Sequence, residues 1–141
     1  MIIREVMNKS VVIGKAELNV KEACNVMIKF NIGSLLITND KKIIGILTPK
    51  NIVKAIANGR DPEKTLVDSV MTKKVITIEP DKELEEAVDL MVKNRIKKLP
   101  VVENGKLVGI ISASDIITIE PRLIESIASL LSVRTPTYTG G

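Results

Sequence analysis

The chain contains one sequence pattern twice, with a constant spacing of 64 residues and no gap between the copies. The segment from Met7 to Ile52 corresponds to the segment from Met71 to Ile116. Identical pairs at this spacing include Glu22/Glu86, Ala23/Ala87, Met27/Met91, Leu35/Leu99, Gly45/Gly109 and Ile52/Ile116. A unit of about sixty residues buries little surface alone, so a repeat of this length predicts two copies of one supersecondary unit packed against each other.

The residue types exclude most enzyme classes. None of the 141 residues is histidine, which removes Ser-His-Asp and Cys-His catalysis together with histidine-based zinc sites. The single cysteine, Cys24, cannot form an intramolecular disulfide. Its place on the apolar face of a predicted helix favours a core residue over a reactive thiol. We therefore expect no catalytic activity, no catalytic cofactor and no metal site.

Charge and hydropathy narrow the expected partners and location. The formal charge of +4 comes from lysines spread along the chain, which suits either a solvated surface or an anionic small ligand. One Phe and one Tyr give no stacking platform, so we expect no nucleic acid partner. No apolar run approaches the roughly 18 residues of a membrane span, and residues 1–5 do not resemble a signal peptide. These features favour a cytoplasmic protein without a membrane partner.

The first copy reads as a β-α-β-β-α unit. A brief strand is predicted at residues 11–13, followed by a helix capped by Asn19 with apolar residues at three- and four-residue spacing. Strands are predicted at 34–38 and 43–47, joined by a turn. Thr48 is expected to cap a second helix with Pro49 at its first position, where the missing N–H of proline costs nothing.

The second copy repeats this order. A strand is predicted at 75–78, a helix at about 82–94, strands at 99–102 and 107–111, and a helix opening at Ser112. Asn104-Gly105 is a strong hairpin signal between the last two strands. The fold class is therefore α+β, with residues 1–60 as the first repeat, 66–120 as the second, 121–133 as an amphipathic helix and 134–141 as a flexible tail. That helix could pack on its own core or form a subunit contact.

Both copies run from a strand through a hydroxyl residue into a helix, at Gly45-Ile-Leu-Thr-Pro-Lys-Asn51 and at Gly109-Ile-Ile-Ser-Ala-Ser-Asp115. Helix capping explains this pattern, because the hydroxyl accepts from the N–H three residues later. The same arrangement can also bind an anion at the helix start, while the carboxylate accepts from the hydroxyls of a sugar. Phosphate at the hydroxyl and ribose at the carboxylate would together describe a nucleotide.

The duplicated unit, the strand Lys98-Leu-Pro-Val-Val102 and the two Gly-apolar-apolar-Ser/Thr-x-x-Asp/Asn patterns resemble a tandem pair of cystathionine-β-synthase (CBS) domains over residues 1–120. The resemblance implies that the two repeats pack through their sheets with pseudo-twofold symmetry. It also implies two clefts for adenosine-type ligands, each drawing residues from both copies.

The resemblance assigns ligand-binding residues to each cleft. The first is implied to contain Ser112, Ser114 and Asp115, faced by Val12, Ile13, Ile32 and Gly33. The second is implied to contain Thr48, Lys50 and Asn51, faced by Ile76, Thr77, Ile96 and Lys97. Asn51 departs from the family's usual Asp, and its neutral amide makes a weaker contact with a diol than a carboxylate does.

Two functions remain open at this point. One is a regulatory module that binds an adenine nucleotide or a derivative such as AMP, ADP, ATP or S-adenosylmethionine, and transmits occupancy to an unknown effector protein. The alternative is a dimerisation scaffold whose degenerate clefts bind nothing. In either case a homodimer is expected, from the apolar stripe on the last helix of each copy and from the surplus helix after Pro121.

Overall fold

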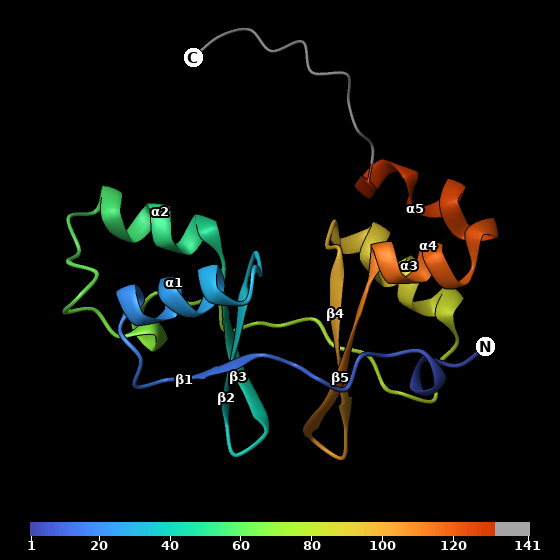
Figure 1. Cartoon of the computed structure of the whole chain (residues 1–141), viewed down its shortest axis with the longest axis horizontal. Coiled ribbons are helices and arrows are strands. Elements are labelled where there is room, and N and C mark those ends of the chain that lie inside the picture. The colour runs from blue at the N-terminus through green and yellow to red at the C-terminus, as the bar shows by residue number, and fades with distance from the viewer. Residues whose placement is uncertain (132–141) are drawn as a thin grey trace, which may run out of the picture. The chain divides into compact units, whose positions relative to one another are not determined.

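The computed structural model describes residues 1–131, and these residues form two compact units (Figure 1). Unit 1 comprises residues 1–9, 77–102 and 108 onward, whereas unit 2 comprises residues 10–76 and 103–107. The predicted tail from residue 134 lies outside the described residues. Each unit is thus built around one sequence repeat, with a short segment taken from elsewhere in the chain.

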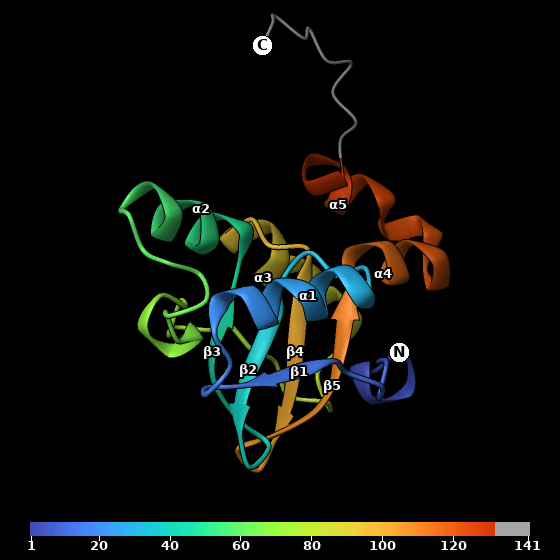
Figure 2. The same ribbon diagram turned by 60° about the vertical axis from the view of Figure 1, so that its left-hand side comes forward.

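Unit 2 contains the first β-α-β-β-α repeat. Strand β1 (Ile13–Lys15) pairs in parallel with β2 (Leu35–Asn39), which pairs antiparallel with β3 (Lys42–Leu47). Helix α1 (Val20–Lys29) follows β1, and α2 (Pro49–Ala57) follows β3. The two helices cover one face of this sheet (Figure 2). The buried core of this unit consists of residues from α1, β2, β3 and a 3₁₀ turn at Val67–Ser69, namely Ala23, Met27, Leu35, Ile37, Leu47 and Val67, and Ile52 of α2 packs against it.

Unit 1 contains the second repeat. Helix α3 (Leu84–Asn94) precedes β4 (Lys98–Glu103) and β5 (Lys106–Ser112), and α4 (Ala113–Ile119) follows. The chain continues through a short 3₁₀ turn (Pro121–Leu123) into α5 (Ile124–Leu131). Helix α5 contacts both α3 and α4, and its Ile127 is fully buried. The surplus helix therefore packs on the core of its own unit.

The segments that precede the two repeats are exchanged between the units. Residues 1–9 belong to unit 1, where Asn8 and Ile110 exchange backbone hydrogen bonds of 2.8 and 2.9 Å. Residues 65–73 belong to unit 2, where Thr72 and Ile46 make the equivalent pair at 2.8 and 2.9 Å. We call residues 1–9 and 65–73 the start segments. Each start segment therefore completes the body of the other repeat.

The start segments explain the shared glycines. A side chain at Gly45 would overlap the Met71 sulfur, and a side chain at Gly109 would overlap the Met7 sulfur. Because each Met lies on a start segment, the Gly and Met of the repeat pattern form one packing contact, made once in each unit. Both residue types recur in the sequence for this steric reason.

The helices and hairpins agree with the sequence, but the two first strands do not. Strand β1 occupies residues 13–15 rather than 11–13, because its parallel register places Gly14 opposite Ile37 on β2. No strand forms at 75–78, where a single bridge joins Ile78 to Val101. Apolar residues alone suggested both strands, and apolar content does not fix where the backbone pairs. The bridge stands at the positions equivalent to the Gly14–Ile37 pair. The second repeat therefore pairs in the same register, but through a single bridge instead of a strand.

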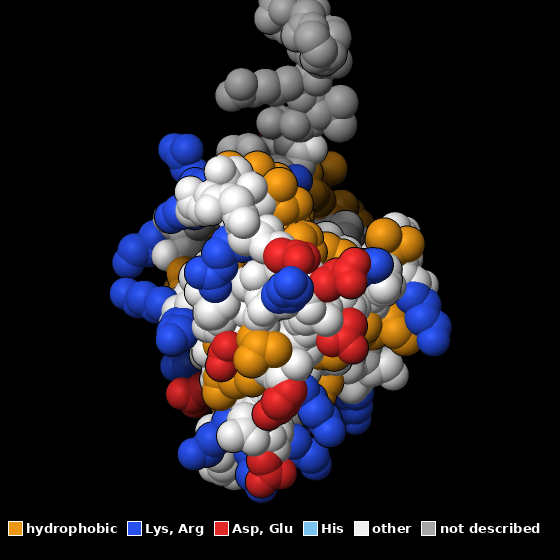
Figure 3. Space-filling view, turned by 90° about the vertical axis from the view of Figure 1, so that its left-hand side faces the viewer, with side chains coloured by type: hydrophobic (Ala, Val, Ile, Leu, Met, Phe, Trp, Pro, Cys, Tyr) orange, Lys and Arg blue, Asp and Glu red, His pale blue; other side chains and the backbone are white. Residues whose placement is uncertain are grey.

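Charge and apolar surface are mixed on the outside of unit 2. Figure 3 shows hydrophobic side chains at the surface between Lys and Arg side chains on the face of the molecule that includes α2. On α2, Val53 and Ile56 are 65% and 56% exposed. Exposed apolar residues in a group are a common sign of an interaction surface.

Candidate functional site

The start of α2 is a closed hydrogen-bond network. The Thr48 hydroxyl accepts from the Asn51 N–H at 3.2 Å, and the Asn51 side-chain oxygen accepts from the Thr48 N–H at 2.9 Å. The same oxygen accepts from the Thr48 hydroxyl at 2.9 Å. The Asn51 amide nitrogen donates to the Thr72 hydroxyl at 3.2 Å. Every polar atom of the Asn51 side chain therefore has a partner within unit 2.

The start of α4 is capped in a simpler way. The Ser112 hydroxyl accepts from the Asp115 N–H at 3.0 Å and lies 3.2 Å from the Ser114 hydroxyl. The Asp115 carboxylate makes no hydrogen bond or ion pair with another side chain within residues 1–131, and this residue is exposed. Two hydroxyls and a carboxylate with unused acceptor capacity thus lie together at the start of α4.

Backbone pairing brings one further predicted residue to this position. The Ala113 N–H donates to the Lys97 carbonyl at 2.8 Å, so the loop before β4 lies beside the start of α4 in unit 1. Lys97 is exposed and Ile96 is half-buried. Unit 1 therefore brings Ser112, Ser114 and Asp115 together with Lys97, although the resemblance assigned Lys97 to the other cleft.

The remaining predicted residues divide between the units. Ile32 and Gly33 lie in unit 2 beside Pro49, at the start of α2. Val12 and Ile76 are half-buried there, and Lys50 is exposed. Thr77 belongs to unit 1 and is exposed.

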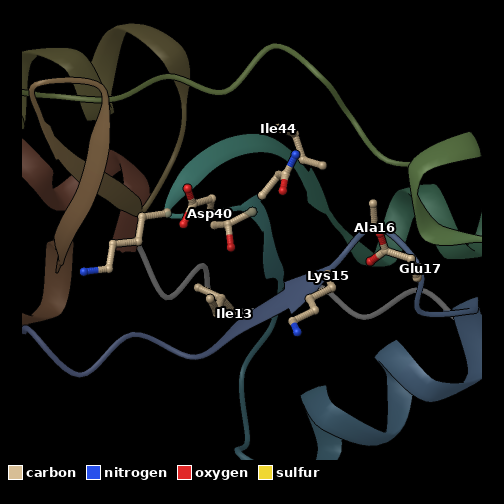
Figure 4. Close-up of a pocket in the computed structure, with 9 residues that line it drawn as sticks. Ile13, Lys15, Ala16, Glu17, Asp40 and Ile44 are labelled. Carbon is tan, nitrogen blue, oxygen red and sulfur yellow. The ribbon is translucent and has the colours of Figure 1, made fainter.

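Ile13 lines a cavity of about 640 Å³ at the far end of the unit 2 sheet (Figure 4). The cavity lies beside the C-terminal ends of β1 and β2, whereas Thr48 follows the opposite end of β3. Its charged lining consists of Lys15, Glu17, Asp40 and Lys41. Figure 4 shows Lys15, Glu17 and Asp40 spread around the cavity rather than directed at one point. Two lysines and two carboxylates give the lining no net charge, so it favours neither an anion nor a cation.

Thr72 is a site residue that sequence reasoning missed. It holds the Asn51 amide through a start segment that is far from Asn51 in sequence. The repeat spacing contains a usable signal, because position 72 corresponds to position 8 and polar residues stand at both.

Cys24 behaves as a structural thiol. It is half-buried on α1, and partial burial raises the pKa of its thiol. A raised pKa reduces the thiolate fraction, which is the nucleophilic form. Residues 1–131 also contain no group of three or more Cys, Asp or Glu side chains arranged to hold a metal ion. No helix in that part of the chain is long and apolar enough to cross a membrane.

Known proteins match this chain in both of its sequence repeats. The sequence pattern of the CBS domain family matches residues 3–58 and 67–121. An uncharacterised protein of Methanopyrus kandleri is 39% identical over 126 residues, which cover 87% of this chain and 64% of that protein. The CBS domain-containing protein YhcV of Bacillus subtilis is 30% identical over 115 residues, covering 81% of each. This chain therefore spans less than two thirds of the Methanopyrus relative.

A solved structure extends the comparison to a ligand complex. The crystal structure of the CBS domain pair of protein MJ0100 in complex with 5'-methylthioadenosine and S-adenosyl-L-methionine matches with a TM-score of 0.74 and 28% identity. The match covers 86% of this chain and 97% of that one. The fold of two β-α-β-β-α repeats is thus shared with a protein that binds adenosine derivatives.

Proposed function

Because the chain belongs to the CBS domain family, with two copies in tandem, we propose that it is a regulatory module that binds an adenosine derivative. Binding of an adenine nucleotide or of an S-adenosylmethionine-type ligand would be passed on to an effector protein. The similar domain pair of MJ0100, which is described with two adenosine derivatives, supports this ligand class.

The unpaired carboxylate of Asp115 carries the proposal. A purely structural Asp at this position would be expected to close a capping box, as Asn51 does at the start of α2. Asp115 instead leaves its oxygens to solvent beside the Ser112 and Ser114 hydroxyls. A carboxylate with both oxygens available can accept hydrogen bonds from the two hydroxyls of a ribose.

The proposed roles follow the chemistry of each side chain. Asp115 accepts from the ribose, and Ser112 and Ser114 donate to polar groups of the ligand. Apolar residues contact the base. In unit 1 the proposed residues are Ser112, Ser114 and Asp115, with Lys97 beside them. In unit 2 they are Thr48, Lys50 and Asn51, with Ile32 and Gly33 beside them.

Calorimetric titration with AMP, ATP, 5'-methylthioadenosine and S-adenosylmethionine tests the proposal. Charge-assisted hydrogen bonds contribute about 1.5 to 3 kcal/mol, against about 0.5 to 1.5 kcal/mol for neutral ones. Asp115→Ala is therefore expected to weaken the tightest binding event by about tenfold or more. Binding of this panel by Asp115→Ala with the affinity of the parent would show that Asp115 is only a helix cap.

Asn51→Ala is the matched control, because it stands at the equivalent position of the other repeat. Its side chain is already occupied by Thr48 and Thr72, so its removal is expected to leave the tightest binding event nearly unchanged. Asn51→Asp tests the same point in reverse. It should strengthen a weaker second binding event, unless repulsion from a ligand phosphate outweighs the gain.

A scaffold without a ligand is the second candidate, and the closed network at Asn51 favours it locally. Native mass spectrometry of the purified protein separates the two functions. A bound adenosine derivative supports sensing. Absence of a co-purified ligand, combined with no heat signal from the panel, supports the scaffold.

A further inference from the structure

The cavity at the ends of β1 and β2 has the size of a ligand site (Figure 4). Its volume of about 640 Å³ lies within the range of small-molecule sites, which is about 300 to 1,000 Å³. All of its lining residues belong to unit 2. Apart from Ile13, none of them was assigned to an adenosine ligand. The cavity is therefore a candidate for a second kind of ligand.

Thr38 places a hydroxyl in the wall of this cavity. It pairs directly with Lys15 across β2 and β1, so the two side chains lie on the same face of the sheet, and both residues line the cavity. Thr38 is only 5% exposed, and its hydroxyl makes no hydrogen bond with another residue of the described chain. No buried side-chain oxygen within residues 1–131 lacks a hydrogen-bond partner, so the Thr38 oxygen is itself accessible. This hydroxyl is thus free to bind a molecule in the cavity.

Charged side chains of both signs surround the cavity without pairing. Within residues 1–131, Lys15, Lys41, Glu17 and Asp40 form no ion pair and no side-chain hydrogen bond. Figure 4 shows Asp40 and Glu17 on opposite sides of the cavity, with Lys15 between them. Positive and negative groups that do not neutralise each other can each bind a ligand group of the opposite sign.

The second repeat shows that the fold does not require these side chains. At the equivalent positions unit 1 has neither the hydroxyl nor the lysines. The equivalent pairs are Thr38/Val102, Lys15/Glu79 and Lys41/Gly105. The carboxylate equivalent to Glu17 is Asp81, which accepts hydrogen bonds of 3.0 and 3.2 Å from Arg4. The unpaired hydroxyl and the unpaired charges are therefore particular to unit 2, and the repeated architecture does not explain them.

We propose that this cavity binds a zwitterion whose two charges are separated by an apolar body, of the class of short peptides. A lysine of the lining binds the carboxylate, and Glu17 or Asp40 binds the ammonium. The apolar body contacts Ile13 and Ile44, and the Thr38 hydroxyl donates to a peptide carbonyl. A ligand of one sign would meet as many like charges as opposite ones. This site is independent of the adenosine ligand.

NMR titration of the isotope-labelled full chain with L-alanyl-L-leucine tests the site. Backbone signals of residues 13–17 and 38–41 should shift to saturation, whereas those of residues 112–115 should not. N-acetyl-L-alanyl-L-leucine lacks the ammonium, and L-alanyl-L-leucine amide lacks the carboxylate. Each should bind about tenfold or more weakly, because one charge-assisted contact is lost. The proposal is wrong if the dipeptide gives no saturable shifts at the cavity, or if either blocked form binds as tightly.

Exchange of residues between the repeats supplies the variants. Thr38→Val and Lys15→Glu place in unit 2 the residues that unit 1 holds at the equivalent positions, so both should fold, and the NMR spectrum checks this. Thr38→Val should weaken dipeptide binding about fivefold, through loss of one neutral hydrogen bond. Lys15→Glu should weaken it about tenfold or more, because a charge that attracts the carboxylate is reversed.

Lys42→Glu is the matched control. Lys42 is an exposed lysine of the same hairpin, it does not line the cavity, and it receives the same change of charge. This variant should bind the dipeptide like the parent, and so should Asp115→Ala, which separates this site from the adenosine site. Unchanged affinity in both Thr38→Val and Lys15→Glu, or an equal loss in Lys42→Glu, would overturn the proposal.

Discussion

The two units differ in complementary ways. Unit 1 covers its helical groove with α5 and leaves the Asp115 carboxylate without a partner. Unit 2 has an open apolar groove between α1 and α2, and it engages the whole side chain of Asn51. The two repeats thus share one architecture and differ in what covers their helices and in how their second helix begins. The difference supports the proposed ligand-binding role at the start of α4.

The largest expected effect concerns burial at equivalent positions. Ile116 is fully buried in unit 1, whereas Ile52 is only half-buried in unit 2. Ile116→Ala is expected to lower the free energy of unfolding by about 2 to 5 kcal/mol, because a packed site cannot collapse around the cavity. Ile52→Ala should cost clearly less. Urea denaturation of both variants makes the comparison, and equal losses would show that the cover of α5 adds no packing to Ile116.

A smaller effect is expected at the two hairpin turns. Lys41 has a φ of 67°, in the left-handed region, where its repeat equivalent is Gly105 with a φ of 78°. A left-handed residue other than Gly costs roughly 1 to 2 kcal/mol, part of which Gly returns through its more flexible unfolded state. Lys41→Gly should therefore stabilise the protein by up to about 1 kcal/mol.

Gly105→Ala is the reciprocal change and should destabilise the protein by about 1 kcal/mol. Thermal unfolding of both variants against the parent measures the pair. The strain interpretation fails if Lys41→Gly lowers the midpoint of unfolding.

The smallest effect concerns pH and the thiol of Cys24, whose equivalent is Val88. Partial burial raises the pKa of Cys24, so the folded state favours the protonated thiol. Its contribution to stability is complete below the unfolded pKa of about 8.5 and is lost as the pH rises through the folded pKa. Cys24→Val should therefore gain stability relative to the parent between pH 8 and pH 10. Chemical denaturation at both pH values measures this gain, and a constant difference would contradict it.

The sequence predicted the elements that rest on local chemistry. Asn19, Thr48 and Ser112 cap the helices that they were expected to cap, and Asn104-Gly105 forms the expected turn. Caps and turns need only neighbouring residues, so a single sequence contains them.

Features that depend on contacts between residues distant in sequence were harder to predict. The position of β1 and the loss of a strand at 75–78 depend on pairing with residues more than twenty positions away. The contact of Thr72 with Asn51 depends on the exchange of the start segments. The difference between the two grooves could not be predicted either, since the sequence was compatible with α5 on its own core or on another subunit. Binding of an adenosine derivative, action on an effector protein and formation of a homodimer stay predictions.

The exchange of the start segments gives the chain an order of assembly during synthesis. Nearly all of unit 2 is complete once residue 76 has left the ribosome, since its own start segment is residues 65–73. Residues 1–9 emerge first, but their backbone partners lie at Pro80, Lys82, Leu84 and Ile110. Residues 1–9 are therefore made before unit 2 but paired after it. Unit 2 is expected to fold before unit 1, because residues 1–9 can pair only after the second repeat has been synthesised.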